Sequence, residues 1–290
     1  SNDKKTYTEF DNWAPDNFDK DTTGGQVAMW YALARSMNRP TVDLYFRTGV
    51  DTVRNTLRAL GLPTKDADKP AMALGAMDIS LREIVPAFGA FAMQGRVVKP
   101  QLIVRITDAQ GNELYRAKKS KTTQAITENT AADINAMLQR AIDQGTGGPL
   151  RSRYGVTSPI AGKTGTSQDY GDAWFVAYTP GLVIGTWVGA FDNAMHFNSA
   201  NGTGGHLALP IAGKVLKQVE QAPELRNRYI RPFTWPLEHT PDLECRPQRE
   251  ADFIERMIND VFDPKRRTTS DTTGAERRNI FDRLFKGTQN

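Results

Sequence analysis

Apolar residues recur at helical spacing in several stretches of the chain, and helix start and stop signals bound these stretches. The spacing predicts helices over residues 27–35, 51–60, 80–94, 128–143 and 209–219. Thr127 and the pair Ser80 and Glu83 are residue types that cap helix N-termini. We expect the first helix to stop near Ser36, because Pro40 disfavours helical geometry at the residue before it.

Strand patterns are strongest between residues 160 and 190. Two runs rich in valine, isoleucine, tryptophan and phenylalanine meet at the turn Thr179-Pro-Gly181. Residues 102–107 and 113–116 alternate around Gly111-Asn112, which predicts a surface hairpin. These periodicities by themselves predict a mixed α/β domain.

The composition changes near Pro223, where prolines and then charged residues replace the periodic pattern. We therefore expect two parts, a domain over residues 1–222 and a C-terminal extension over 223–290. The extension is predicted to be partly disordered, with short helices at 252–261 and 279–284.

The overall composition is that of a globular protein, with 39% hydrophobic and 24% charged residues and a net charge of +4. Basic residues in the C-terminal part are balanced by acidic ones, so nucleic acid is not implied. The single cysteine, Cys245, excludes a disulfide within the chain. The three histidines lack ligand spacing, and no stretch approaches the ~20 apolar residues of a membrane span. We expect no metal and no cofactor.

The sequence Ala161-Gly-Lys-Thr-Gly-Thr-Ser167 is the first candidate for chemistry. Lys163 would supply positive charge, and Thr164 and Thr166 would supply hydroxyls, to a carboxylate bound along an open strand edge. Gly165 would let a substrate backbone lie flat on the strand. Taken alone, the Lys-Thr-Gly tripeptide is also compatible with an ordinary edge strand that carries a solubilising lysine.

Ser36 and Asn38 form the second candidate, because they follow the first predicted helix and precede Pro40. Both side chains could project from a rigid loop into a site. Taken alone, they are also compatible with a helix C-terminal turn in which serine and asparagine cap backbone groups.

Five segments in a fixed order resemble the transpeptidase domain of class A penicillin-binding proteins, over about residues 10–220. The segments are Ala32-Leu-Ala-Arg-Ser-Met-Asn-Arg-Pro40, Gln144-Gly-Thr-Gly-Gly148, Gly162-Lys-Thr-Gly-Thr166, Asp172-Ala-Trp-Phe-Val-Ala-Tyr-Thr-Pro180 and Thr203-Gly-Gly-His-Leu-Ala-Leu-Pro-Ile211. The resemblance implies the α/β transpeptidase fold shared with β-lactamases, an antiparallel five-stranded sheet flanked by helices on both faces.

The resemblance also implies the activity: a D,D-transpeptidase that cross-links peptidoglycan stem peptides through an acyl-serine and is trapped by β-lactams. Ser36 would relay a proton toward the leaving group, and Asn38 would orient the active-site lysine and the substrate amide. Lys163 would complete the proton network. Thr164 and Thr166 would bind the terminal carboxylate, with the Thr166 N–H as one half of the oxyanion hole.

The family's nucleophile lies in a Ser-x-x-Lys motif that opens a hydrophobic helix. The only matching spacing upstream of Ser36 is Ser1-Asn2-Asp3-Lys4, and the polar residues after it do not predict such a helix. We therefore expect the nucleophile to come from a missing upstream segment of the same protein, and the isolated chain to be inactive. The resemblance places a glycosyltransferase domain and a membrane anchor upstream as well. The expected location is extracytoplasmic, on the periplasmic face of the inner membrane, and other cell-wall synthesis proteins are candidate partners.

Two alternative functions stay open. A serine β-lactamase or D,D-carboxypeptidase would use the same fold, although no residue here is a candidate deacylating base. A non-catalytic ligand-binding or scaffold domain would keep the carboxylate-binding strand without a nucleophile.

Overall fold

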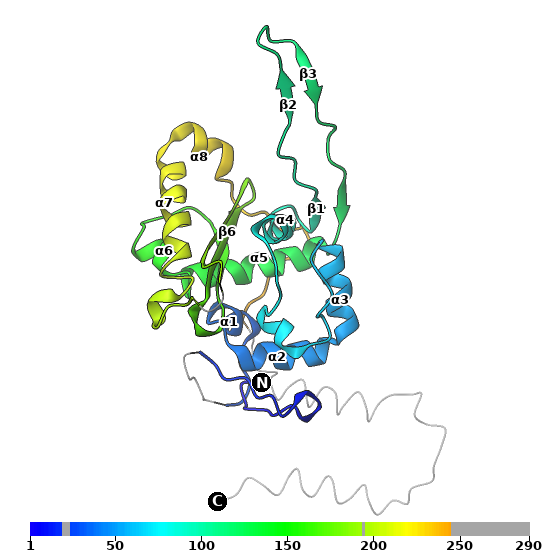
Figure 1. The fold of residues 1–290 in the computed structure, drawn as a ribbon, viewed down its shortest axis with the longest axis vertical. Coiled ribbons are helices and arrows are strands. Elements are labelled where there is room, and N and C mark those ends of the chain that lie inside the picture. Colours follow the sequence, from blue (N-terminus) through cyan, green and yellow to red (C-terminus); the bar gives the residue numbers. More distant parts are fainter. Residues whose placement is uncertain (19–23, 193–194, 245–290) are drawn as a thin grey trace, which may run out of the picture. The chain divides into compact units, whose positions relative to one another are not determined.

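The computed structural model describes residues 1–18, 24–192 and 195–244 (Figure 1). Its helices are α1 (Met29–Ala34), α2 (Asn38–Thr48), α3 (Val50–Ala59), α4 (Leu81–Ala92), α5 (Glu128–Asp143), α6 (Pro149–Ser152), α7 (Ala208–Gln221) and α8 (Pro223–Tyr229). Its strands are β1 (Arg96–Val98), β2 (Arg105–Thr107), β3 (Glu113–Arg116), β4 (Thr122–Gln124), β5 (Ala161–Thr166), β6 (Asp172–Thr179) and β7 (Leu182–Gly189).

The centre of the fold is an antiparallel sheet in the order β5-β6-β7. Side chains of β6 alternate between its two faces. Ala173, Phe175 and Ala177 belong to a buried cluster with α7. Tyr178 belongs to a second cluster that includes residues of α4 and α5. Helices therefore cover both faces of the sheet, as predicted.

The number of strands differs from the prediction. Within the described residues this sheet has three strands instead of five, and the remaining four strands form two separate pairs, β1 with β4 and β2 with β3. These short strands lie along the two arms of one long hairpin that leaves the body of the fold (Figure 1). They pair with each other, so they add nothing to the edges of the central sheet.

The helix caps predicted at Ser80 and Thr127 are confirmed. Glu83 Oε2 accepts bonds from both the backbone N–H and the hydroxyl of Ser80, at 2.9 and 2.6 Å. Thr127 Oγ1 accepts the Thr130 N–H at 3.1 Å and begins α5. Such contacts span three residues, so the local sequence alone is enough to specify them.

The expectation about Pro40 is only half right. The first helix ends at Ala34, close to the predicted stop. Arg39, however, is helical, because α2 begins at Asn38 and contains Pro40 in its first turn. Proline is tolerated there because N–H groups of the first turn have no partner within the helix.

The first compact unit comprises Ser1–Glu244, so the predicted boundary at residue 222 falls inside it. Two contacts hold the segment after α7 to the sheet: Thr179 Oγ1 donates to the Tyr229 carbonyl at 2.5 Å, and the rings of Tyr178 and Phe233 pack edge to face. The predicted helices at 252–261 and 279–284, and Cys245, lie outside the described residues.

A buried asparagine joins α5 to the sheet and to α4. Asn135 Nδ2 donates to the Phe91 carbonyl at 3.0 Å, and the Tyr178 hydroxyl donates to Asn135 Oδ1 at 2.7 Å. Asn135 is only 5% exposed, so water cannot easily replace either bond. Burial also raises the pKa of the Tyr178 hydroxyl well above its ordinary value, which keeps it a donor at neutral pH.

Replacing Asn135 by alanine should therefore lower the free energy of unfolding by about 2 kcal/mol, because two buried polar groups lose their partners. Urea denaturation of the chain measures this change. Asn129→Ala, at an exposed position of the same helix, is the control and should change stability by less than about 0.5 kcal/mol. Equal effects of the two substitutions would contradict the assigned role of Asn135.

Candidate active site

The predicted carboxylate-binding sequence forms β5, an edge strand of the central sheet. Among the described strands β5 pairs only with β6, in a register that sets Lys163 opposite Val176 and Thr166 opposite Ala173. The outer edge of β5 therefore has no strand partner among the described residues, which is the edge that an extended ligand would pair with. A side chain at Gly162 would come within 2.6 Å of the Val176 carbonyl oxygen, so the strand can lie here only with glycine.

The space for a side chain at Gly165 is also limited. A Cβ at this position would lie 3.1 Å from the Cβ of Trp174 on β6. The close approach seen in the structure is thus between the two strands. The predicted approach of a substrate backbone at Gly165 stays a prediction.

Ser36 and Lys163 are brought together across the fold. Lys163 Nζ donates a hydrogen bond to Ser36 Oγ and another to the Thr164 carbonyl oxygen, the latter at 2.9 Å. Ser36 has a φ of 53°, in the left-handed region that is uncommon for residues other than glycine. This conformation follows the end of α1 and aims the hydroxyl at β5. Strained backbone of this kind is characteristic of functional sites.

Burial lowers the pKa of Lys163 from its ordinary value of 10.5 to about 8. The physical cause is the cost of removing an ammonium group from water, and no carboxylate among the described residues offsets it. A substantial fraction of Lys163 is consequently neutral near pH 8. A lysine in this state can both give and accept a proton.

The turn Gln144-Gly-Thr-Gly-Gly148 holds the end of α1 in place. The Thr146 N–H donates to the Ala34 carbonyl at 3.0 Å, two residues before Ser36. A Cβ on Gly145 would come within 2.2 Å of the same carbonyl oxygen. This contact requires glycine and fixes the loop that carries Ser36.

The two threonine hydroxyls of β5 are also held from outside the strand. Thr164 Oγ1 lies 2.5 Å from Thr146 Oγ1, and Thr166 Oγ1 accepts the Gly204 N–H at 3.1 Å. An occupied acceptor side leaves the Thr166 proton free to point at a ligand oxygen. In the sequence, the only signal for Thr146 and Gly204 is that both belong to the ordered segments that resemble the transpeptidase family.

The side chain of Asn38 bonds to a part of the chain that the sequence did not indicate. Its Nδ2 donates to the Asp16 carbonyl at 2.7 Å, and the residue begins α2. This bond ties the N-terminal segment to the loop of Ser36. The structure thus joins Ser36 to Lys163 but gives the amide of Asn38 a backbone partner, and its predicted role toward lysine and substrate stays a prediction.

The side chains of Ser1 and Lys4 are engaged elsewhere. Ser1 Oγ donates to Asp3 Oδ2 at 2.6 Å, and Lys4 Nζ lies 3.3 Å from Asp16 Oδ1. Neither contact involves Lys163. That the nucleophile lies outside this chain stays a prediction.

Residues 1–18, 24–192 and 195–244 contain no group of three or more potential metal ligands. The described histidines make hydrogen bonds of their own; His239 Nε2, for example, lies 2.8 Å from Asp133 Oδ1. Over the same part of the chain, every helix is too short or too polar to cross a membrane.

Replacing Thr146 by valine removes the hydroxyl that contacts Thr164 and should cost about 1 kcal/mol of stability, because Thr164 loses a half-buried partner. Thermal and urea unfolding measure the loss. Thr157→Val is the control: it makes the same substitution at an exposed loop position and should leave stability unchanged. A neutral Thr146→Val would show that this contact does not stabilise the strand.

The fold and the edge strand define a class of protein, the penicillin-recognising transpeptidases. Residues 1–217 match the penicillin binding protein transpeptidase domain, about three quarters of the chain, so the chain belongs to this family. The chain is also similar to curated penicillin-binding proteins 1B and 1A. Penicillin-binding protein 1B of Vibrio cholerae is 30% identical over 182 residues, covering 62% of this chain and 23% of that protein. Penicillin-binding protein 1A of Aquifex aeolicus is 32% identical over 203 residues, covering 69% and 27%.

Solved structures show the same fold. Penicillin-binding protein 1A from Haemophilus influenzae superposes with a TM-score of 0.68 at 22% identity, covering 78% of this chain and 38% of that one. The D,D-transpeptidase domain of a peptidoglycan glycosyltransferase from Eggerthella lenta superposes with a TM-score of 0.57 at 21% identity, covering 72% and 57%. The chain spans about a quarter of the length of the curated relatives from Vibrio cholerae and Aquifex aeolicus.

Proposed function

We propose that this chain forms the substrate-binding wall of a serine D,D-transpeptidase that cross-links peptidoglycan stem peptides. The observation that carries the proposal is the hydrogen bond from Lys163 to Ser36, made beside the two oriented hydroxyls of Thr164 and Thr166. Membership of the penicillin-binding transpeptidase family supports the same conclusion.

In the proposed reaction the stem peptide lies along the open edge of β5. Thr164 and Thr166 donate to its terminal carboxylate, and the protonated fraction of Lys163 attracts the same charge. The nucleophilic serine attacks the penultimate D-Ala carbonyl, and the Thr166 N–H stabilises the developing oxyanion. The C–N bond then breaks, terminal D-Ala leaves as an amine, and the acyl group passes to the amine of a neighbouring stem.

Ser36 and Lys163 act on protons in this scheme. The departing nitrogen needs a proton, which Ser36 can deliver while Lys163 replenishes it through their hydrogen bond. A pKa of about 8 suits this work, because a group that titrates near the working pH exchanges protons in both directions. Asn38 would orient the active-site lysine and the substrate amide once a ligand is bound.

We further propose that the acylated serine comes from a segment outside residues 1–290. In support, the polar surroundings of Ser1 and Lys4 resemble no activated nucleophile. A glycosyltransferase region, a membrane anchor and an extracytoplasmic location belong to the same proposal. The Eggerthella lenta structure, a transpeptidase domain of a peptidoglycan glycosyltransferase, supports the pairing of the two activities.

Labelled penicillin tests the proposal. The chain alone, and the complete protein expected from the family resemblance, are each incubated with the label and examined by intact mass and peptide mapping. We expect no adduct on residues 1–290 and a long-lived adduct on the complete protein. An adduct on Ser1 or Ser36 would overturn the assigned roles. Rapid turnover of the adduct would indicate a β-lactamase, and a complete protein that is never labelled would indicate a scaffold domain.

A further inference from the structure

A long hairpin between α4 and α5 stands away from the rest of the first unit (Figure 1). Its outer part, β2 and β3, forms a two-stranded ribbon in which every residue over 101–107 and 111–116 is exposed. Two strands alone are marginally stable in water, because neither face is covered. Contacts outside the ribbon are therefore needed to stabilise it.

The ribbon and the segment before it carry exposed apolar side chains. Ile106 lies directly opposite Tyr115, so these two side chains share one face of the ribbon. Leu102 and Val104, which precede β2, and Leu114 on β3 are 90%, 60% and 66% exposed. Contiguous apolar side chains in water mark interaction sites in folded proteins.

The hairpin is also strongly basic. Between residues 99 and 121 it carries six basic residues and two acidic ones. The six are Lys99, Arg105, Arg116, Lys118, Lys119 and Lys121. Arg105 and Arg116 are directly opposite each other. Arg116 is paired with Glu113, whereas within the described residues no carboxylate pairs with Arg105. An acidic partner would supply the counter-charge that Arg105 lacks.

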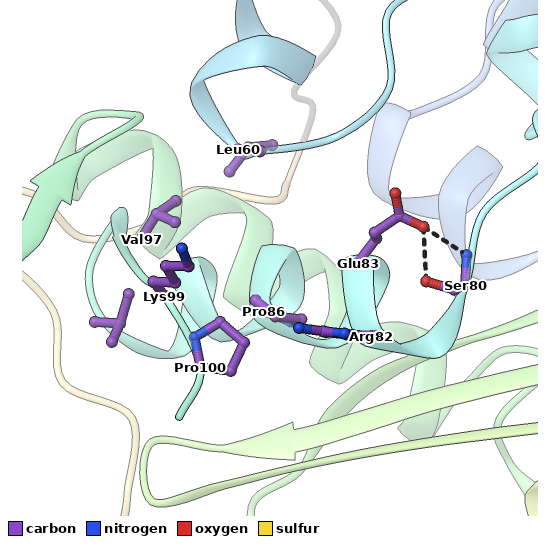
Figure 2. A pocket seen from close by; sticks show the side chains of 10 residues that line it. Leu60, Ser80, Arg82, Glu83, Pro86, Val97, Lys99 and Pro100 are labelled. Atoms are coloured by element: carbon purple, nitrogen blue, oxygen red, sulfur yellow. Dashed lines mark hydrogen bonds between the residues drawn. The ribbon is translucent and has the colours of Figure 1, made fainter. Parts of the chain in front are cut away.

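A cleft of about 620 Å³ at the root of the hairpin has the same combination of properties. Figure 2 shows its apolar lining, which includes Leu60, Pro86 and Val97, and the basic side chains Arg82 and Lys99. The one acidic residue in its lining, Glu83, is bonded to Ser80 and caps α4. The lining of the cleft ends at Lys99 and Pro100, so along the chain the cleft directly precedes the outer part of the hairpin.

We propose that this surface, residues 99–121 with the cleft at their root, is the docking site for an extended acidic segment of a second protein. The segment would add as a strand to an edge of the ribbon, with apolar side chains on the Ile106 face and carboxylates toward the basic side chains. Lipid could not pair with the open N–H and C=O groups of these edges. A second copy of this chain would bring further positive charge to the same place.

A pair of synthetic probes tests the proposal by fluorescence anisotropy with the whole chain. One labelled peptide alternates glutamate with valine, and the matched peptide alternates lysine with valine. We expect the acidic peptide to bind at least about tenfold more tightly, and added salt to weaken it. Ile106→Asp and Arg105→Glu should each weaken its binding about tenfold. Both positions are exposed, so melting temperatures should stay unchanged.

Two matched controls apply the same substitutions elsewhere on the surface: Leu237→Asp at a fully exposed leucine and Arg231→Glu at an exposed arginine. They should leave binding unchanged. Equal affinity for the two peptides, or equal losses in the controls, would overturn the proposal. So would an Ile106-dependent association with phosphatidylglycerol vesicles in place of peptide, or an Ile106-dependent dimer in analytical ultracentrifugation.

Discussion

Replacing Lys163 by methionine is expected to slow acylation of the complete protein by penicillin by about 10²–10⁴-fold, the usual contribution of a positioned acid–base group. Methionine keeps much of the apolar stem but cannot bond to Ser36 or exchange a proton with it. The rate of labelling by a fluorescent penicillin measures the effect. Lys163→Arg separates charge from titration, because arginine stays protonated and should restore ligand attraction without proton exchange.

Lys214→Met serves as the matched control, since Lys214 is exposed on α7 and has no part in the proposed reaction. Its labelling rate should equal that of the unmodified protein. If Lys163→Met were also labelled at the unmodified rate, Lys163 would have no role in acylation.

The same substitution predicts a change of stability with pH that the chain itself can report. In the unfolded chain Lys163 keeps its proton up to about pH 10.5, whereas burial lowers its pKa to about 8 in the folded state. Between these values the unfolded state binds more protons, so stability rises with pH. Relative to Lys163→Met, the unmodified chain should gain up to about 3 kcal/mol between pH 7 and pH 10.5, measured by urea denaturation at each pH. If the difference in the free energy of unfolding between the two proteins did not change with pH, burial would not lower the pKa of Lys163.

The second large effect is expected from Gly204→Ala. A Cβ at this position would lie 2.3 Å from the Trp174 carbonyl oxygen and 2.4 Å from that of Gly165. Both are backbone atoms in paired strands and cannot rotate away, so the loop must move. We expect a loss of about 3 kcal/mol in the free energy of unfolding. Since Gly204 N–H also bonds to Thr166 Oγ1, the complete protein should bind penicillin more weakly as well.

The neighbouring residue provides a close control. A Cβ on Gly205 would meet only the Thr146 carbonyl oxygen, at an ordinary 3.7 Å. Gly205→Ala should therefore change stability by less than about 1 kcal/mol. Similar losses in the two variants would mean that chain flexibility, and not the contact with β5, explains the requirement for glycine at 204.

Features that depend on neighbouring residues were predicted well. The caps at Ser80 and Thr127, the hairpin around Gly111-Asn112 and the strands joined at Thr179-Pro-Gly181 all agree with the structure. Each is specified by contacts between residues only a few positions apart. The start of α2 was missed, because Pro40 was taken to disfavour helical geometry at Arg39. In the structure Pro40 lies in the first turn of α2, where its missing N–H costs no hydrogen bond.

The candidate site shows the limit of such reasoning. Motif spacing identified Ser36, Lys163 and the threonines, but their roles in the proposed reaction came from resemblance. The supports of the site, Thr146 and Gly204, had no chemical signal of their own. Thr146 reaches β5 through its hydroxyl and Gly204 through its backbone N–H, and only the tertiary packing brings these groups to the strand.

The sequence by itself determined the helices α1, α3, α4, α5 and α7, the central strands and the residue types available for chemistry, because periodicity and capping act over short distances. Only the tertiary structure decided that Ser36 meets Lys163 across 127 positions of the chain, that Asn38 bonds to Asp16, and that the first unit continues to Glu244. These outcomes follow from how helices pack on the sheet. Burial in that packing, and no property of the Lys-Thr-Gly sequence alone, is what lowers the pKa of Lys163.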